Sequence, residues 1–208
     1  KIDIPYYVVD LSPDFKDNVI DYFVNDYLEG RTPNPCIECN RHIKFGLLLE
    51  KARELEADFI ATGHYARKGY DEASGRFYIY EGEDSSKDQT YVLFGLNQEQ
   101  LKATLFPIGE LQKSEVRAIA EKLSLRVFDK PDSQEICFVK AGYGDFVKSY
   151  APDRLPGTGE FMDEAGQVMG THEGSHLFTI GQRKRIQITD ETPYYVTHID
   201  AKSNRVTI

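Results

Sequence analysis

The sequence predicts an α/β fold built around a parallel sheet, followed by a small antiparallel β domain. Up to about residue 145, apolar runs of strand length alternate with helical patterns, which is typical of βα units around a parallel sheet. After about Tyr150 the chain changes to short alternating stretches separated by Gly and Pro turns, which is typical of a small β domain. We therefore divide the chain into residues 1–145 and 146–208.

The first elements follow from local signals. Ile4–Asp10 is rich in aromatic and β-branched residues and predicts a buried strand. Ser12 and Pro13 predict the start of a helix, and Gly30 predicts its end. Asn40 is expected to begin a second helix. The expected apolar positions are Phe15, Val19, Tyr22, Phe23 and Tyr27 in the first helix, and Ile43, Leu47, Leu48, Ala52 and Leu55 in the second.

The middle of the chain predicts a strand over Asp58–His64 that runs into a glycine turn. Ligands collect at the carboxyl ends of parallel strands, where Gly63 and His64 would lie. Phe77–Tyr80 predicts one strand of a hairpin, and Asn97 and Ser114 predict the starts of two further helices. The inward face of the second is expected to hold Val116, Ile119, Ala120 and Leu123, followed by a short strand at Val127–Phe128.

The last part of the chain predicts short strands joined by tight loops. Glu164–Gly166 and Lys202–Asn204 have the composition of hairpin loops. The expected strands are Glu160–Asp163, Gln167–Thr171, His176–Ile180, Tyr194–Asp200 and Arg205–Ile208.

The charge limits the classes of partner. A net charge of −9 and a pI near 5.1 argue against a general nucleic-acid coat, which needs a basic face. A local basic run at Gln182–Arg185 leaves a nucleic-acid enzyme open, although it is also compatible with a solvated cluster at a strand end. No apolar run approaches the length of a membrane span, and no signal peptide is visible. We expect a soluble, cytoplasmic protein with no membrane partner.

The three cysteines carry the most specific chemistry. Cys36 and Cys39 form a C-x-x-C pair, and Cys137 is distant in sequence. An odd number of cysteines without a secretory signal favours thiol chemistry or metal ligation over disulfides. Zinc would need further ligands, three thiolates can hold a 4Fe–4S cluster with one open iron, and Cys137 taken alone could be a small buried hydrophobe. Cys39 precedes the expected helix start at Asn40, where the helix dipole would favour a thiolate.

Five motifs together resemble the tRNA-specific 2-thiouridylases, the MnmA/TrmU family. They occur in the family's order and span nearly the whole chain. The motifs are Gly30–Asn40 with Ile43-Lys44-Phe45, Ala61–Tyr65, Lys87-Asp88-Gln89-x-Tyr91, Asp132-Ser133-x-x-Ile136-Cys137-Phe138, and Gly181–Lys184. The resemblance implies a partial Rossmann-like sheet of the adenine nucleotide alpha hydrolase type. Residues 1–145 would be the C-terminal portion of its PP-loop ATPase catalytic domain, and 146–208 its central β domain.

The resemblance also implies a reaction. ATP, with Mg²⁺, adenylates the C2 oxygen of the wobble uridine in the anticodon stem-loop of tRNA, and sulfur then replaces that oxygen to give 2-thiouridine. Cys137 would carry a persulfide received from a persulfide donor protein or cysteine desulfurase. Cys39 would be the second catalytic cysteine, which releases the sulfur and forms a transient disulfide with Cys137.

Further site residues are implied by the same motifs. Gly63 would contact ATP through its backbone. Asn34, Pro35 and Cys36 would face the target base, and His64, Lys87, Asp88 and Gln89 would contact the tRNA.

Two departures from the family pattern qualify these expectations. The 208 residues contain neither the Ser-Gly-Gly-Val-Asp-Ser-Ser type of phosphate-binding loop nor the family's C-terminal β-barrel, so we expect this fragment alone to be inactive. Some members carry Asp at the position of Cys36. A persulfide relay and a 4Fe–4S cluster on Cys36, Cys39 and Cys137 that carries sulfide therefore both stay open. A zinc-stabilised RNA-binding module is the non-enzymatic alternative.

Overall fold

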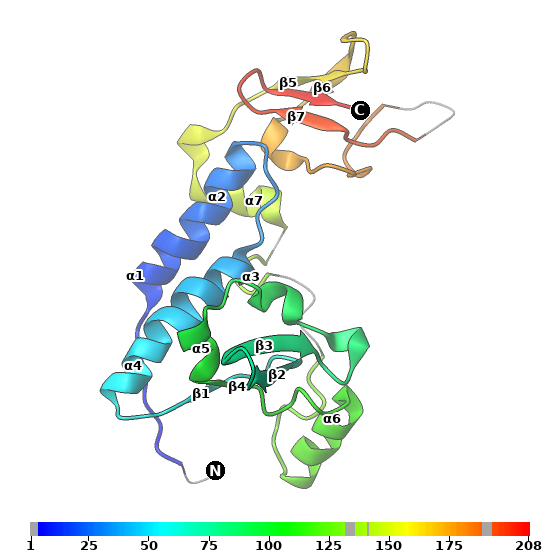
Figure 1. Cartoon of the computed structure of the whole chain (residues 1–208). Coiled ribbons are helices and arrows are strands. Elements are labelled where there is room, and N and C mark those ends of the chain that lie inside the picture. The colour runs from blue at the N-terminus through cyan, green and yellow to red at the C-terminus, as the bar shows by residue number, and fades with distance from the viewer. Residues whose placement is uncertain (1–3, 132–135, 141, 189–192) are drawn as a thin grey trace. The chain divides into compact units, whose positions relative to one another are not determined.

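The computed structural model describes residues 4–131, 136–140, 142–188 and 193–208 (Figure 1). The chain forms two compact units. The first unit consists of residues 1–18 and 36–132, and the second of residues 19–35 and 133–208. The predicted α/β class with a following β domain is confirmed, whereas the sequence-based division at residue 145 stays a prediction.

The first unit contains two small sheets, and one of them includes a strand at Thr104–Leu105 that the sequence did not predict. Strand β1 (Ile60–Ala61) pairs in parallel with β4 (Thr104–Leu105), with Ile60 opposite Thr104. Strands β2 (Ala66–Asp71) and β3 (Arg76–Glu81) form the predicted antiparallel hairpin. The core beside them consists of the buried residues Phe45, Leu49, Ile60, Ala66 and Leu93.

The helix that carries the C-x-x-C pair begins earlier than predicted. It is α-helical over Pro35–Glu38 (α3), π-helical over Cys39–Leu47 and α-helical again over Leu48–Glu54 (α4), and Figure 1 shows α3 and α4 as the two ends of one helix. The predicted start at Asn40 is wrong. Pro35, whose fixed φ suits the first helical position, begins the helix instead.

The apolar face of this helix also differs from the prediction. Ile43 is buried as expected, but Leu48 and Leu55 are exposed, and Phe45 and Leu49 fill the core in their place. The π-helical turns explain the difference, because their i→i+5 hydrogen bonds rotate later side chains away from the positions of a 3.6-residue repeat.

The predicted N-terminal strand is wrong. Residues 4–10 have no regular structure, and their apolar side chains are exposed, with Tyr6 at 86%. No strand in the described part of the chain pairs with this segment, and β propensity alone does not form a strand without a partner.

The first helix ends as predicted, but its N-cap is Leu11, and Ser12, the predicted N-cap, is the first helical residue. It runs through α1 (Ser12–Phe15), a π-helical stretch (Lys16–Ile20) and α2 (Asp21–Leu28). Gly30 closes it with φ +74°, and the Arg31 N–H donates to the Asp26 carbonyl at 2.8 Å. This is the left-handed glycine closure that the sequence predicted.

The helices after the hairpin confirm one cap and correct another. Asn97 caps α5 (Gln98–Lys102) in a capping box, as predicted. Helix α6 (Lys113–Lys122) is capped by Gln112 rather than Ser114. Short 3₁₀ turns occupy Ser85–Lys87 and Thr90–Leu93.

The expected inward face of α6 is wrong. No described residue of this helix is buried, Leu123 just after it is 61% exposed, and Val127–Phe128 lies in an exposed turn rather than a strand. A 3.6-residue period shows that a helix has an apolar face. The period does not show whether another part of the protein packs on that face.

The second unit combines a helix pair with a four-stranded sheet. Helix α7 (Tyr143–Tyr150) packs on α2 around Phe23, Val24, Tyr27 and Val147. The sheet has the order β6-β5-β8-β7, from β5 (Gly159–Met162), β6 (Val168–His172), β7 (His198–Asp200) and β8 (Arg205–Thr207). A 3₁₀ turn, Pro152–Arg154, precedes β5.

Both predicted hairpin loops are confirmed, at Gly166 (φ +81°) and Asn204 (φ +54°). The two antiparallel hairpins join through a parallel β5–β8 pair, which the local sequence does not indicate. The predicted strand His176–Ile180 is wrong, because Ser175–Leu177 forms a 3₁₀ turn that Gly174 precedes with φ +143°. Across the described ranges, no helix combines the length and apolarity needed to cross a membrane.

Candidate functional site

The C-x-x-C pair lies at the start of its helix. Asn34 directly precedes the helix, Pro35 is its first residue and is buried, and Cys36 is exposed in the first turn. Cys39 lies one turn further and is half-buried. Residues three apart on a helix are neighbours on one face, so the two thiols share a surface. The dipole at the helix start therefore acts most strongly on Cys36 and not, as predicted, on Cys39.

Asn40 anchors this helix instead of capping it. Its side chain is only 2% exposed, and its Nδ2 donates to the Val92 carbonyl at 2.9 Å. The Phe45 carbonyl accepts from Gln100 Nε2 at 2.8 Å. These two bonds fix the cysteine-bearing helix to the 90–93 turn and to α5, so Cys39 lies on a rigid element.

The end of β1 presents Gly63 and His64, as predicted for a parallel strand. The His64 ring is 7% exposed, and its Nδ1 lies 2.8 Å from the Thr62 hydroxyl. Burial, with a smaller contribution from the charge of Lys44, lowers the pKa of His64 to about 4. His64 is therefore a neutral imidazole near pH 7.

Gly63 leaves open space beside the backbone. A Cβ at this position would meet only the Ile108 side chain, at 3.9 Å. A ligand can therefore approach the main chain of Gly63 closely, which fits the backbone contact to a nucleotide that the resemblance implies.

The Lys87–Gln89 segment is tied to the strand-end motif by its side chains. Asp88 accepts from the Gly82 N–H at 3.1 Å and from the Thr90 hydroxyl at 2.5 Å. Gln89 Oε1 accepts from the Tyr65 N–H at 3.1 Å, and the Gln89 N–H donates to the Tyr65 carbonyl at 2.9 Å. The structure thus brings the Ala61–Tyr65 and Lys87–Tyr91 motifs together, and it gives Asp88 and Gln89 a positioning role within the first unit.

The segment before the C-x-x-C pair is fixed within the second unit. The Thr32 hydroxyl is hydrogen-bonded to the Thr179 hydroxyl. The Arg31 guanidinium donates to the Asp26 carboxylate, with Nε at 3.0 Å, and pairs with Glu29. These contacts therefore fix the conformation of the segment that precedes the helix, residues 30–34.

Cys137 is exposed, so the interpretation that it is a small buried hydrophobe is wrong. Its neighbours Ile136 and Phe138 pack against the core formed by α2 and α7, and Val139 belongs to that core. The chain thereby holds the thiol at the surface on an anchored segment. Asp132 and Ser133 of the same motif lie outside the described residues.

The described residues do not gather a metal-binding group. In those ranges, no set of three or more His, Cys, Asp or Glu side chains is arranged to hold a metal. All three cysteines are thiols. Cys36 and Cys39 belong to the first unit, and Cys137 belongs to the second.

Comparison with known families covers almost the whole chain. Residues 1–141 match the family model described as the tRNA methyl transferase HUP domain, and residues 144–208 match the tRNA methyl transferase PRC-barrel domain.

The chain belongs to this family.

Curated members of the family are close relatives, and they confirm the resemblance drawn from the five motifs. The chain is 52% identical over 99% of its length to "tRNA-specific 2-thiouridylase MnmA 2" of Thermoanaerobacter sp. (strain X514), covering 56% of that protein. It is 51% identical over its whole length to the MnmA of Symbiobacterium thermophilum and 50% identical to that of Clostridium acetobutylicum, covering 54% and 58% of them. The chain thus spans about half the length of the curated relatives it matches.

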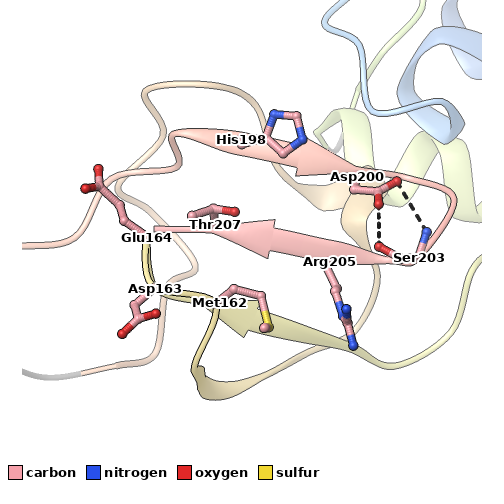
Figure 2. Close-up of a pocket in the computed structure, with 9 residues that line it drawn as sticks. Met162, Asp163, Glu164, His198, Asp200, Ser203, Arg205 and Thr207 are labelled. Carbon is pink, nitrogen blue, oxygen red and sulfur yellow. Dashed lines mark hydrogen bonds between the residues drawn. The ribbon is translucent and has the colours of Figure 1, made fainter.

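The structure of this family member also contains a hollow that the motifs did not indicate. Figure 2 shows a hollow on the sheet of the second unit, with His198, Arg205 and Thr207 on its strands and the Asp200 carboxylate bonded to Ser203. None of the five motifs contributes to its lining. Strand alternation places these side chains on one face, but only the strand order β5-β8-β7 brings them together.

Sequence reasoning also left Gln182 and Tyr143 without a role. The Tyr143 hydroxyl lies 2.9 Å from Gln182 Oε1 and donates to the Leu177 carbonyl at 2.7 Å. The signal that could have found Gln182 was its position inside the fifth motif, next to the basic run.

Proposed function

We propose that the protein carrying this chain is an ATP-dependent tRNA sulfurtransferase that converts the wobble uridine to 2-thiouridine. The proposal rests on one observation: the cysteines lie on elements that are packed into the protein. Cys36 and Cys39 lie at a helix start, and Cys137 is exposed between residues that pack into a core. Surface thiols on rigid supports suit a sulfur-transfer role. Relatives about 50% identical that are named tRNA-specific 2-thiouridylase support the same activity.

The proposed chemistry assigns different steps to the cysteines. The terminal sulfur of a Cys137 persulfide attacks C2 of the adenylated uridine, and AMP leaves with the former C2 oxygen. The Cys39 thiolate then attacks Sγ of Cys137. The sulfur–sulfur bond to the transferred atom breaks, a Cys39–Cys137 disulfide forms, and the thiocarbonyl remains on the base. A thiol reductant regenerates the two thiols.

The other site residues bind and orient the substrates. Gly63 contacts ATP through its backbone, and the open space beside it supports this assignment. Asn34, Pro35 and Cys36 face the target base, with the tRNA anticodon stem-loop as the bound part. His64 contacts the tRNA as a neutral hydrogen-bonding group, in keeping with its lowered pKa.

The Lys87–Gln89 segment has two kinds of role in this proposal. Lys87 supplies a positive charge for the tRNA backbone. Asp88 and Gln89 hold the segment in place through their bonds to Gly82, Thr90 and Tyr65.

The activity test uses the intact protein with unmodified tRNA, ATP, Mg²⁺, a cysteine desulfurase and cysteine. We expect 2-thiouridine at the wobble position together with release of AMP. Mass spectrometry of the nucleosides separates exchange of oxygen for sulfur from addition of a methyl group, the reaction named in the family description. Methylation without sulfur incorporation would overturn the proposal.

The relay is tested by substituting each cysteine. Cys39→Ser and Cys137→Ser are expected to abolish thiolation, whereas Cys36→Ala retains measurable activity because Cys36 takes no covalent step. Iron and sulfide are measured after anaerobic purification of the wild type and of Cys36→Ala. Stoichiometric iron that disappears in Cys36→Ala, together with loss of activity, would reject the relay in favour of a 4Fe–4S cluster on the three cysteines.

A further inference from the structure

The Gln182 side chain occupies a junction in the second unit. Its Oε1 accepts from the Thr179 N–H at 3.2 Å and lies 2.9 Å from the Tyr143 hydroxyl. Its Nε2 donates to the carbonyls of Leu177 at 3.2 Å and Lys184 at 2.8 Å. A carboxamide has two acceptor lone pairs and two N–H donors, so Gln182 uses both donors and at least one acceptor position here.

This junction fixes the conformation of the residues on either side. The Gln182 N–H donates to the Thr179 carbonyl at 3.0 Å, and Gly181 has φ +80°, as the third position of a type II turn requires. The Val196 N–H donates to the Gln182 carbonyl at 3.0 Å. Residues 183–185, here called the basic turn, therefore follow a braced segment.

The basic turn displays three cations. Arg183, Lys184 and Arg185 are all exposed, and the Arg185 guanidinium lies 5.8 Å from the centre of the Tyr143 ring. Arg185 has φ +71°, a left-handed conformation that is uncommon outside glycine. Such a backbone persists only where the surroundings hold it, as the Gln182–Lys184 bond does here.

The charges of the basic turn are not neutralised within the described part of the chain. Arg31, Arg41, Arg67 and Arg205 each pair with a carboxylate, whereas no described acidic residue forms an ion pair with residues 183–185. In a protein with 34 acidic residues and a net charge of −9, three adjacent cations without such partners form a local site for a polyanion.

The basic turn is linked to the segment that leads to the C-x-x-C pair. The Thr179 hydroxyl, at the start of the braced segment, is hydrogen-bonded to the Thr32 hydroxyl. Residues 30–35 belong to the same unit as the basic turn. The proposed function has Asn34 and Pro35 facing the target base, so the bond between Thr32 and Thr179 connects the segment that leads to that base with the segment that leads to the basic turn.

We infer that the basic turn, Arg183–Arg185, binds backbone phosphates of the tRNA strand next to the target nucleotide, with Gln182 as the positioning residue. This inference rests on the proposed function, because it takes tRNA as the substrate. Phosphate contacts carry no sequence information but fix the register of the RNA. The basic turn thus holds the strand while the base is presented to the thiols.

The experiment measures binding of a synthetic anticodon stem-loop RNA to the intact protein by fluorescence anisotropy, between about 50 and 200 mM salt. For R183A/K184A we expect weaker binding and a plot of log K against log salt that is shallower by about 0.7–0.9 for each phosphate that the variant no longer neutralises. K122A/R126A removes the same charge from exposed positions outside the five motifs, so it should keep the wild-type slope.

A second variant separates geometry from charge. Gln182→Met keeps the net charge and nearly the side-chain length but cannot make the hydrogen bonds to Thr179, Leu177 and Lys184. We expect a shallower slope when binding is measured well below the melting temperature of the variant. If Gln182→Met does not fold, the R183A/K184A comparison decides alone.

The outcomes distinguish this inference from the proposed function. If the wild type thiolates tRNA but R183A/K184A keeps its affinity and slope, the basic turn does not bind phosphate and the proposed function stands. An equal loss in K122A/R126A would also overturn the inference. If the wild type binds the RNA through the basic turn but forms no 2-thiouridine, the proposed function is wrong, whereas the inference that the basic turn binds RNA phosphates is supported.

Discussion

At the scale of single residues, His64 combines a site position with a buried, neutral ring. The pKa of His64 is about 4 in the folded protein against 6.5 for an unperturbed histidine, so the unfolded chain binds more protons between these values. The free energy of unfolding therefore rises with pH across this window and falls as the pH drops from about 6.5 toward about 4. The shift corresponds to at most about 3 kcal/mol.

The prediction for His64 is a change in the pH dependence of stability. In denaturant titrations from about pH 4 to about pH 7, His64→Gln should lose part of the acid destabilisation seen in the wild type. It should not lose all of it, because burial also lowers the pKa values of His172 and His176. An unchanged pH profile in His64→Gln would mean that the pKa of His64 is the same in the folded and unfolded protein.

At the scale of elements, helix starts show how far local signals reach. The Gln100 N–H donates to the Asn97 side-chain oxygen at 2.9 Å, and the Asn97 N–H donates to the Gln100 side-chain oxygen at 3.0 Å. Both partners lie within four consecutive residues, so the sequence suffices to predict this cap. For α6, Gln112 is the N-cap and forms a capping box with Glu115. The general preference for Ser at this position favours Ser114 and therefore predicts the wrong residue.

The two caps give a matched pair of substitutions. Asn97→Ala should lower the free energy of unfolding by about 1 kcal/mol, because the Gln100 N–H loses its acceptor, the Asn97 side chain. Ser114→Ala, at the position that the sequence suggested as a cap, should change it by less than about 0.5 kcal/mol. Urea unfolding measures both, and an equal loss in the two variants would contradict the assigned caps.

At the scale of the whole molecule, the two units contain separate cores. Phe45 is fully buried in the core of the first unit beside Leu49 and Leu93. Phe161 is buried beside Phe178 and Val206 under the sheet of the second unit. Each ring contributes to one unit only, so damage to a core should be local.

The prediction is a separation of effects in hydrogen exchange. Phe45→Ala should cost about 3–5 kcal/mol and accelerate amide exchange in the β2–β3 hairpin, while β5 and β8 keep their protection. Phe161→Ala should do the reverse. Mass spectrometry of peptides from the two regions measures both effects. Simultaneous loss of protection in both units with either variant would show that they unfold as one.

The same scales explain which predictions succeeded. Gly30, Gly166 and Asn204 end their elements through their own backbone conformations, so neighbouring residues predict them. Residues 4–10 and α6 have apolar patterns as clear as those of buried elements, yet they are exposed. Asp88 and Gln89 stay predicted RNA contacts, and the structure adds side-chain bonds to Gly82 and Tyr65 that the local sequence does not indicate.

The sequence by itself determined the family and the glycine and hairpin turns, because these depend on residue types at short, fixed spacings. Only the tertiary structure decided that Cys36 lies in the first helical turn, that Cys137 is exposed and that Gln182 braces the basic turn. The physical reason is that burial and side-chain hydrogen bonds depend on partners far away in the chain. An amino-acid pattern shows which contacts a residue is able to make, and folding selects among them.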